Sequence, residues 1–184
     1  MPNHPLPTAL AILLVALVVP AALIDIRSRR IPNWLTLSGI VAGIAANVII
    51  DPGNWSSPLL GAALGFAVYF PLYLVRGMGA GDVKLMAAVG AIAGARFWFH
   101  IFVVTGVLGG ICAILFVIGR KQFRRTLTNV MFIMQELAAF RPPYARDEQI
   151  DVQNPEMLRM PHGAIIALGC LVFLSGVTLR LLGR

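Results

Sequence analysis

Long apolar runs alternate with short polar segments along most of the chain. A transmembrane helix needs about 20 predominantly apolar residues, or somewhat fewer where flanking side chains reach the interface. The pattern therefore predicts an all-α, polytopic membrane protein with about six transmembrane helices. The six apolar runs lie at about 8–24, 35–50, 58–75, 83–95, 99–118 and 162–181.

The only long polar connection lies between the last two apolar runs, at about 119–160. Within it, residues 121–140 place apolar side chains three or four positions apart, with polar and charged residues between them. This spacing is helical, so we expect an amphipathic helix lying in the membrane interface. Residues 141–158 contain three prolines and many charges and are predicted to be irregular. Because no internal repeat is visible, residues 1–184 are interpreted as one domain with a cytosolic loop at about 119–160.

The composition excludes an ordinary soluble domain. Apolar residues make up 58% of the chain and charged residues 12%, whereas about a quarter of a typical soluble domain is charged. The net charge of +7 is carried by short basic clusters between apolar runs. Such clusters are typical of membrane topology signals, so no nucleic-acid partner is expected. The first ten residues contain no Lys or Arg, so residues 8–24 are predicted to be a retained helix rather than a cleaved signal.

The basic residues also predict which side of the membrane each connection occupies. Twelve of the fifteen Lys and Arg residues lie in the first, third and fifth connections, and three lie on the opposite side. The positive-inside rule places the side with twelve in the cytoplasm. Both termini are then exterior, which in the inner membrane of a Gram-negative cell means periplasmic.

Three acidic residues lie outside the long loop, and each needs an explanation because ionisable groups at membrane depth are costly. Asp51 precedes a Pro-Gly pair and is predicted to lie in an exterior turn. Asp25 ends the first apolar run and is followed by three arginines. It is either an interfacial carboxylate paired with an arginine or a functional group. Pro32 cannot continue a helix, and Asn33 is a candidate cap of the next one.

Asp82 follows three glycines at alternate positions, Gly77, Gly79 and Gly81. Such a segment is predicted to form a loop that can adopt positive φ and lets other groups approach closely. That would suit an active-site loop. The alternatives are a phosphate cradle, although the spacing and a preceding strand are missing, and a helix start with Asp82 as its N-cap. Lys84 is either part of the site or a basic anchor at the interface.

Asp25 and Asp82 are predicted to lie on the same, cytoplasmic side, at the ends of different helices. Two nearby carboxyl groups with restricted water cannot both ionise easily and share one proton. The ionised group can take a proton from water while the protonated group polarises a scissile carbonyl. The pair therefore suggests aspartic protease chemistry, a form of general acid–base catalysis.

Other catalytic chemistries find less support in the sequence. His4, His100 and His162 do not share one predicted side, so no metal site is expected. Cys112 and Cys170 lie inside separate apolar runs and are interpreted as small apolar side chains without a redox or nucleophilic role. No serine lies in a Gly-x-Ser-x-Gly setting.

Three segments of the chain resemble a known family. Residues 79–82 fit the Gly-x-Gly-Asp motif of membrane aspartic proteases, and residues 77–86 closely resemble the signature of the type IV prepilin peptidases. Asp25 with residues 29–33 resembles that family's first aspartate region, and residues 161–169 resemble a third family segment. The segments come in the family's order and span most of the chain.

The resemblance implies a function. Enzymes of this family remove the short leader from prepilins and pseudopilins at the cytoplasmic face of the membrane, next to the hydrophobic helix of the substrate. By this match Asp25 and Asp82 are the catalytic pair, and no metal or organic cofactor is needed. Gly77, Gly79, Gly81 and Lys84 are expected at the substrate-binding site.

Two departures from the family pattern shape the expectation. The long form of the family carries paired Cys-x-x-Cys motifs and an N-methyltransferase activity, and this sequence has neither those cysteines nor room for that domain. A peptidase-only form, as in tight-adherence (Flp-type) pilus systems, is therefore expected. Tyr is the more usual family residue where His162 stands, so no role is assigned to His162.

Two other classes of function remain open at this point. A proton-coupled transporter could use the two aspartates as a relay, although it would favour carboxylates near the midplane and an internal repeat. A non-catalytic membrane subunit of a pilus or secretion assembly would tolerate Asp→Asn at both positions.

Overall fold

The computed structural model describes residues 6–74, 78–119, 131 and 161–182. These residues confirm the prediction of an all-α protein, because the segments between the caps and turns are helical. The predicted interfacial helix at 121–140 lies outside the described residues, apart from Met131. The elements are α1 (Thr8–Ser28), α2 (Asn33–Ile50), the short 3₁₀ helix η1 (Pro52–Asn54), α3 (Ser56–Leu74), α4 (Ala80–Gly119) and α6 (His162–Leu182).

Within the described residues, four stretches of helix are long and apolar enough to cross a membrane: α1, α2, Pro52–Leu74 and α4. The last helix, α6, contributes a shorter apolar stretch, His162–Gly176. The runs predicted as separate helices at 83–95 and 99–118 belong to one element, α4, which is interrupted at Gly94. The prediction of six separate spans is therefore not confirmed, and the number of membrane crossings stays a prediction.

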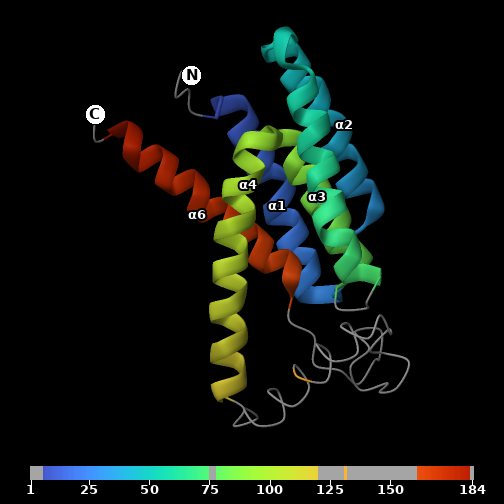
Figure 1. The fold of residues 1–184 in the computed structure, drawn as a ribbon, viewed down its shortest axis with the longest axis vertical. Helices are drawn as coiled ribbons and strands as arrows, with labels where there is room; N and C mark the ends of the chain where they lie inside the picture. Colours follow the sequence, from blue (N-terminus) through green and yellow to red (C-terminus); the bar gives the residue numbers. More distant parts are fainter. Residues whose placement is uncertain (1–5, 75–77, 120–130, 132–160, 183–184) are drawn as a thin grey trace.

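The helix α4 folds back on itself at Gly94 (Figure 1). Gly94 has φ 73° and ψ 165°, a backbone conformation that is essentially restricted to glycine. The residues before it (80–93, the first leg) and after it (95–119, the second leg) run in opposite directions, so that both ends of α4 lie at the same end of the bundle (Figure 1). α1 ends and α6 begins at that end as well.

The first leg of α4 is the centre of the bundle. From Leu85 to Ala93 its residues are buried on every side, and Leu85, Met86 and Ile92 have no exposed surface. This explains why the segment is apolar all round, since a helix with no polar face is one that is buried. The neighbouring helices α2 and α3 instead expose many large apolar side chains, as helices that face lipid do.

Glycines let α3 approach the first leg very closely. A methyl group at Gly90 would overlap the carbonyl group of Gly61, and one at Gly65 would overlap the carbonyl group of Met86. Small residues at such crossings allow two backbones to pack directly against each other, which is a common way for helices to associate in membranes. The pairing of Gly61 with Gly90 and of Gly65 with Met86 also shows that α3 and the first leg are antiparallel.

Asn47 of α2 contacts the first leg just before the turn at Gly94. Its side-chain amide donates hydrogen bonds to the carbonyl oxygens of Ala91 at 3.1 Å and Ile92 at 3.0 Å, and to Gly43 of its own helix at 2.9 Å. The last carbonyls of a helical segment have no partner within it. Asn47 therefore helps to end the first leg where the chain turns.

Candidate active site

Asp25 lies in the last turn of α1 and only 6% of its surface is exposed. Its Oδ2 atom accepts a hydrogen bond of 2.8 Å from the backbone N–H of Gly163, and the amide of Ala164 also interacts with it. Both amides belong to the first turn of α6, where N–H groups lack a partner within the helix. The partial positive charge of a helix N-terminus stabilises a carboxylate. Asp25 therefore caps α6 across a large separation in sequence.

Asp82 is the third residue of α4. Its Oδ2 atom accepts a hydrogen bond of 3.3 Å from the backbone N–H of Gly79, the residue that precedes the helix. An acidic side chain that bonds back in this way from the third helical position is one half of a capping box. The alternative that Asp82 is itself the N-cap is wrong, since the helix begins two residues earlier. Because α4 starts with its buried leg, Asp82 is half-buried at the end of the bundle.

The structure brings the two predicted carboxyl groups together. Asp25 and Asp82 interact electrostatically, and His162, the first residue of α6, interacts with both of them. Tyr69 of α3, which is only 5% exposed, also interacts with Asp82. Four helices thus contribute polar side chains to one place, at the end of the bundle where α1 ends and α4 and α6 begin. We call this the carboxylate end.

Ile31 packs between the two helix starts that hold the carboxylates. A methyl group placed on Gly81 would lie 3.1 Å from the Cβ atom of Ile31, and one on Gly163 would lie 2.9 Å from its Cδ1 atom. The same methyl group on Gly163 would lie 3.0 Å from Oδ2 of Asp25. Glycine at both positions therefore lets Ile31 and the two helix N-termini close around the carboxyl groups.

Lys84 and Asn33 join the segments that carry the two aspartates. The Nζ atom of Lys84 donates a hydrogen bond of 2.8 Å to Oδ1 of Asn33. The prediction of Asn33 as a helix cap is wrong, because Pro32 holds the cap position and Asn33 is the first residue of α2. Its side chain instead reaches across to α4. Lys84 is therefore more than a basic anchor at the interface, since it links α4 to the start of α2.

The glycine-rich segment before Asp82 differs from its prediction. We expected a loop with positive φ, but α4 already begins at Ala80, so Gly81 lies in its first turn. Among the described glycines only Gly94 has a positive φ. Gly79 precedes the helix, and a methyl group on it would lie 3.2 Å from Oδ2 of Asp82. Gly77 lies outside the described residues.

Two residues of the carboxylate end were not singled out from the sequence. His162 was left without a role, although it begins the last helix on the side predicted to hold both aspartates. Tyr69 was hidden within the apolar run 58–75, where one phenol among apolar side chains gives little signal.

Asp51, predicted to lie in a turn, is the residue that caps the end of α2. Its backbone carbonyl oxygen accepts a hydrogen bond of 3.1 Å from the backbone N–H of Asn54.

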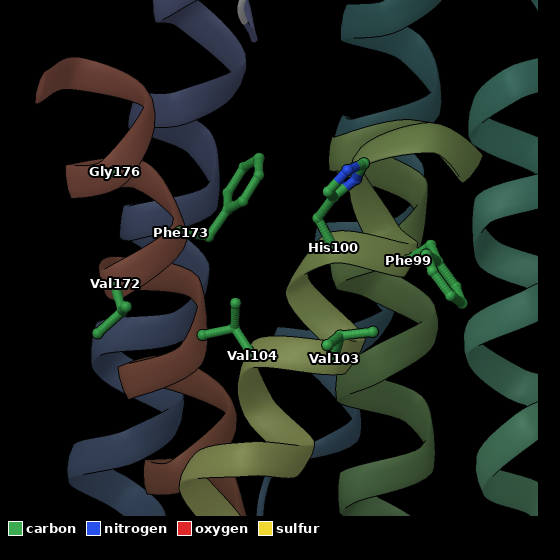
Figure 2. Close-up of a pocket in the computed structure, with 7 residues that line it drawn as sticks. All are labelled: Phe99, His100, Val103, Val104, Val172, Phe173 and Gly176. Atoms are coloured by element: carbon green, nitrogen blue, oxygen red, sulfur yellow. The ribbon is translucent and has the colours of Figure 1, made fainter. Parts of the chain in front are cut away.

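A pocket of about 400 Å³ lies elsewhere, between the second leg of α4 and α6 (Figure 2). Figure 2 shows Phe173 reaching from α6 toward the second leg. Phe173 is ten residues beyond Gly163, or about 15 Å along the helix, so the pocket is well separated from the carboxyl groups. Its lining is apolar except for His100, and it offers no acidic group for hydrolysis. The lining residues are Phe99, His100, Val103, Val104, Val172, Phe173 and Gly176.

Comparison with known proteins assigns the chain to a family. Residues 11–114, more than half of the chain, match the Type IV leader peptidase family. The chain belongs to this family. The matched residues include Asp25, Asp82, Gly79 and Gly81. The match therefore covers the parts of α1 and α4 that meet at the carboxylate end. The apolar helices together with the family indicate an inner membrane protein.

Curated relatives carry the name prepilin leader peptidase/N-methyltransferase. The protein of Bacillus subtilis is 32% identical over 124 residues, which is 64% of this chain and 48% of that protein. The protein of Escherichia coli is 30% identical over 138 residues, or 71% of this chain and 60% of that protein. The protein of Myxococcus xanthus is 30% identical over 112 residues, 57% of this chain and 33% of that protein. The chain thus spans between a third and three fifths of these relatives. No solved structure matches this chain.

Proposed function

We propose that this chain is a membrane aspartic endopeptidase that removes the leader from Flp-like prepilins at the cytoplasmic face of the membrane. Asp25 and Asp82 are its catalytic pair. The observation that carries the proposal is that these two carboxyl groups, from α1 and α4, interact with each other at one end of the bundle. The printed name of the relatives, prepilin leader peptidase/N-methyltransferase, supports the same class of substrate.

The arrangement supports a general acid–base mechanism. The two carboxyl groups share one proton, because two adjacent carboxylates cannot both ionise easily. The backbone amides of Gly163 and Gly79 both bond to Oδ2 atoms, and we assign the attacking water to the Oδ1 atoms. The ionised carboxylate takes a proton from this water as its oxygen attacks the scissile carbonyl carbon. The protonated carboxyl group gives its proton to the carbonyl oxygen.

Collapse of the tetrahedral intermediate completes the cleavage. The carboxyl group that took the proton from water delivers it to the leaving amide nitrogen, and the other carboxylate recovers its proton from the intermediate. The pair returns to its starting state with one proton shared. The reaction consumes one water and needs no metal or organic cofactor.

The orientation follows from charge and from the path of the chain. We infer six crossings, namely α1, α2, α3, the two legs of α4, and α6. With this path the connections that carry twelve of the fifteen basic residues lie at the carboxylate end, and the positive-inside rule puts that end in the cytoplasm. Both termini are then periplasmic, and the active site faces the side on which a prepilin leader resides.

The substrate segment is placed by the glycines and Lys84. The hydrophobic helix of the prepilin lies beside α1 and α4 in the membrane, and the scissile bond enters next to Gly79, where a side chain would lie 3.2 Å from Oδ2 of Asp82. Gly77 and Gly81 stay predicted contacts of the substrate. Lys84 uses one of the three donors of its ammonium group on Asn33, and the other donors are assigned to carbonyl oxygens of the substrate backbone.

The test is prepilin processing by the purified protein in lipid vesicles, followed as the mass lost with the leader. Asp25→Asn and Asp82→Asn keep the shape of the side chain and remove its proton chemistry, so each should slow cleavage at least about a hundredfold. Asp51→Asn is the matched control, because Asp51 lies in an exposed turn between α2 and α3. Normal cleavage by the first two variants would leave the aspartates structural and bring the transporter or assembly-subunit alternatives forward.

A further inference from the structure

His162 occupies a place at the carboxylate end that the proposed mechanism does not use. It is the first residue of α6 and is half-buried. Its peptide neighbour Gly163 donates the 2.8 Å hydrogen bond to Asp25, so the backbone of His162 is fixed relative to that carboxylate. The backbone that carries the imidazole is therefore held beside the pair by a structural contact.

His162 interacts electrostatically with Asp25 and also with Asp82. Three other charged or titratable groups lie at the carboxylate end. They are Arg29, which follows α1 and interacts with Asp25; Lys84 of α4, which is bonded to Asn33; and Tyr69 of α3, which interacts with Asp82. His162 thus interacts with both carboxyl groups from a third helix.

We propose that His162 is a positioning residue of the carboxyl pair, whose charged imidazole keeps one carboxyl group ionised in mildly acidic conditions. This inference rests on the proposed function. A histidine side chain carries a positive charge when its imidazole is protonated. A cation a few ångströms away favours the ionised form of a carboxyl group.

The sign of the effect follows from which form of the pair is active. The mechanism needs one carboxylate and one carboxylic acid, so activity is lost at low pH when the second carboxyl group takes up a proton. The imidazolium opposes that uptake, and His162 therefore extends activity to lower pH. The alkaline limb is set by the loss of the shared proton from the carboxyl pair itself.

The experiment is the pH profile of kcat/KM for prepilin processing by the full chain in lipid vesicles. His162→Gln should move the acid limb to higher pH by about one unit, the lower end of the effect of a nearby opposite charge, with the alkaline limb unchanged. On the acid side this is about a tenfold loss of rate. His162→Lys keeps a cation and should restore the acid limb. His100→Gln is the matched control, because His100 lines the separate pocket.

Each outcome decides between the alternatives. A profile of His162→Gln that superimposes on the wild type would overturn the inference. So would an equal loss at every pH in both the Gln and Lys variants, since that would mean His162 only holds α6 in place. If wild type shows no cleavage at any pH, or Asp25→Asn cleaves as well as wild type, the proposed function itself has failed, and this failure is distinguishable from the first two.

Discussion

The carboxylate of Asp25 accepts a 2.8 Å hydrogen bond from the backbone N–H of Gly163, across 138 residues of sequence. One side chain thus has two tasks, because Asp25 caps the last helix and is also a member of the proposed catalytic pair. The position of the start of α6 and the position of the Asp25 carboxyl group are therefore coupled. Substitutions at the start of α6 should change the rate of cleavage although they alter neither aspartate.

Gly163→Ala should lower kcat/KM for prepilin processing by about tenfold, because the neighbours must shift by a fraction of the displacement of about 1 Å that can cost about a hundredfold at a catalytic site. The added methyl group would lie 3.0 Å from Oδ2 of Asp25 and 2.9 Å from Ile31, so one of them must move. Gly176→Ala in the same helix has no neighbour within 4 Å and should process normally. Equal rates for the two variants would show that the contact with Gly163 does not position Asp25.

Gly90→Ala should destabilise the bundle by about 1–3 kcal/mol, the usual effect of forcing a methyl group into a packed interface. The methyl group would overlap the carbonyl group of Gly61, so α3 and the first leg of α4 must separate. Unfolding of the purified protein in detergent by heat or SDS measures the change. Gly110→Ala, in the second leg with nothing within 4 Å, is the control and should be neutral or slightly stabilising, because alanine favours a helix more than glycine does. An equal effect of both variants would show that the contact with Gly61 does not decide the stability.

Asn47→Leu should lower the free energy of unfolding by about 1–3 kcal/mol, because it leaves the carbonyl oxygens of Ala91 and Ile92 without this donor. Leucine has a similar size but no hydrogen-bonding group, so the measurement isolates the amide. Asn54→Leu, in the exposed turn after α2, is the comparison. If the two variants unfold alike, the turn at Gly94 does not depend on Asn47.

Lys84→Met and Asn33→Leu should each lower kcat/KM several-fold, and the double variant should be no worse than the more damaged single one. The reason is that both changes remove the same 2.8 Å hydrogen bond, and residues that act through one contact are not additive. Prepilin processing by the four proteins gives the coupling energy. Effects that simply add would mean that Lys84 acts on the substrate independently of Asn33.

Cysteine labelling should test the proposed orientation. With Cys112 and Cys170 replaced, a cysteine at Ser28 is exposed at the carboxylate end, and one at Asn54 is exposed in the turn between α2 and α3. A membrane-impermeant maleimide added to intact cells should label Asn54→Cys only, and it should label Ser28→Cys only after the cells are opened. The reverse pattern would place the carboxyl groups in the periplasm, where a prepilin leader is not exposed.

The pairing of the two aspartates could be predicted, whereas the contacts that hold them could not. Asp25 and Asp82 stand out because acidic groups are costly in apolar surroundings, and the distribution of arginines places both on one side. Gly163 gives no such signal, because a backbone amide carries no sequence information about a carboxylate in a distant helix. Asn33 was misassigned for a related reason: its local position suggests a cap, but its partner is Lys84 of another helix.

The glycines show a second limit. Gly81 lies within a helix although glycine lowers helix propensity, because its lack of a side chain lets Ile31 pack against the first turn. Gly90 and Gly94 are only four residues apart in the same apolar run. One is a contact point between helices and the other reverses the chain. Composition and periodicity do not separate these two roles, and so the prediction of 83–95 and 99–118 as two helices was made without identifying the residue that divides them.

A straight helix of the length of α4, 40 residues, would extend about 60 Å, twice the thickness of the hydrocarbon core of a bilayer. The reversal at Gly94 divides that length between two legs and returns the chain to the end from which it started. The last helix can therefore begin beside Asp25. The geometry of the carboxylate end thus depends on one residue that takes no part in the proposed chemistry.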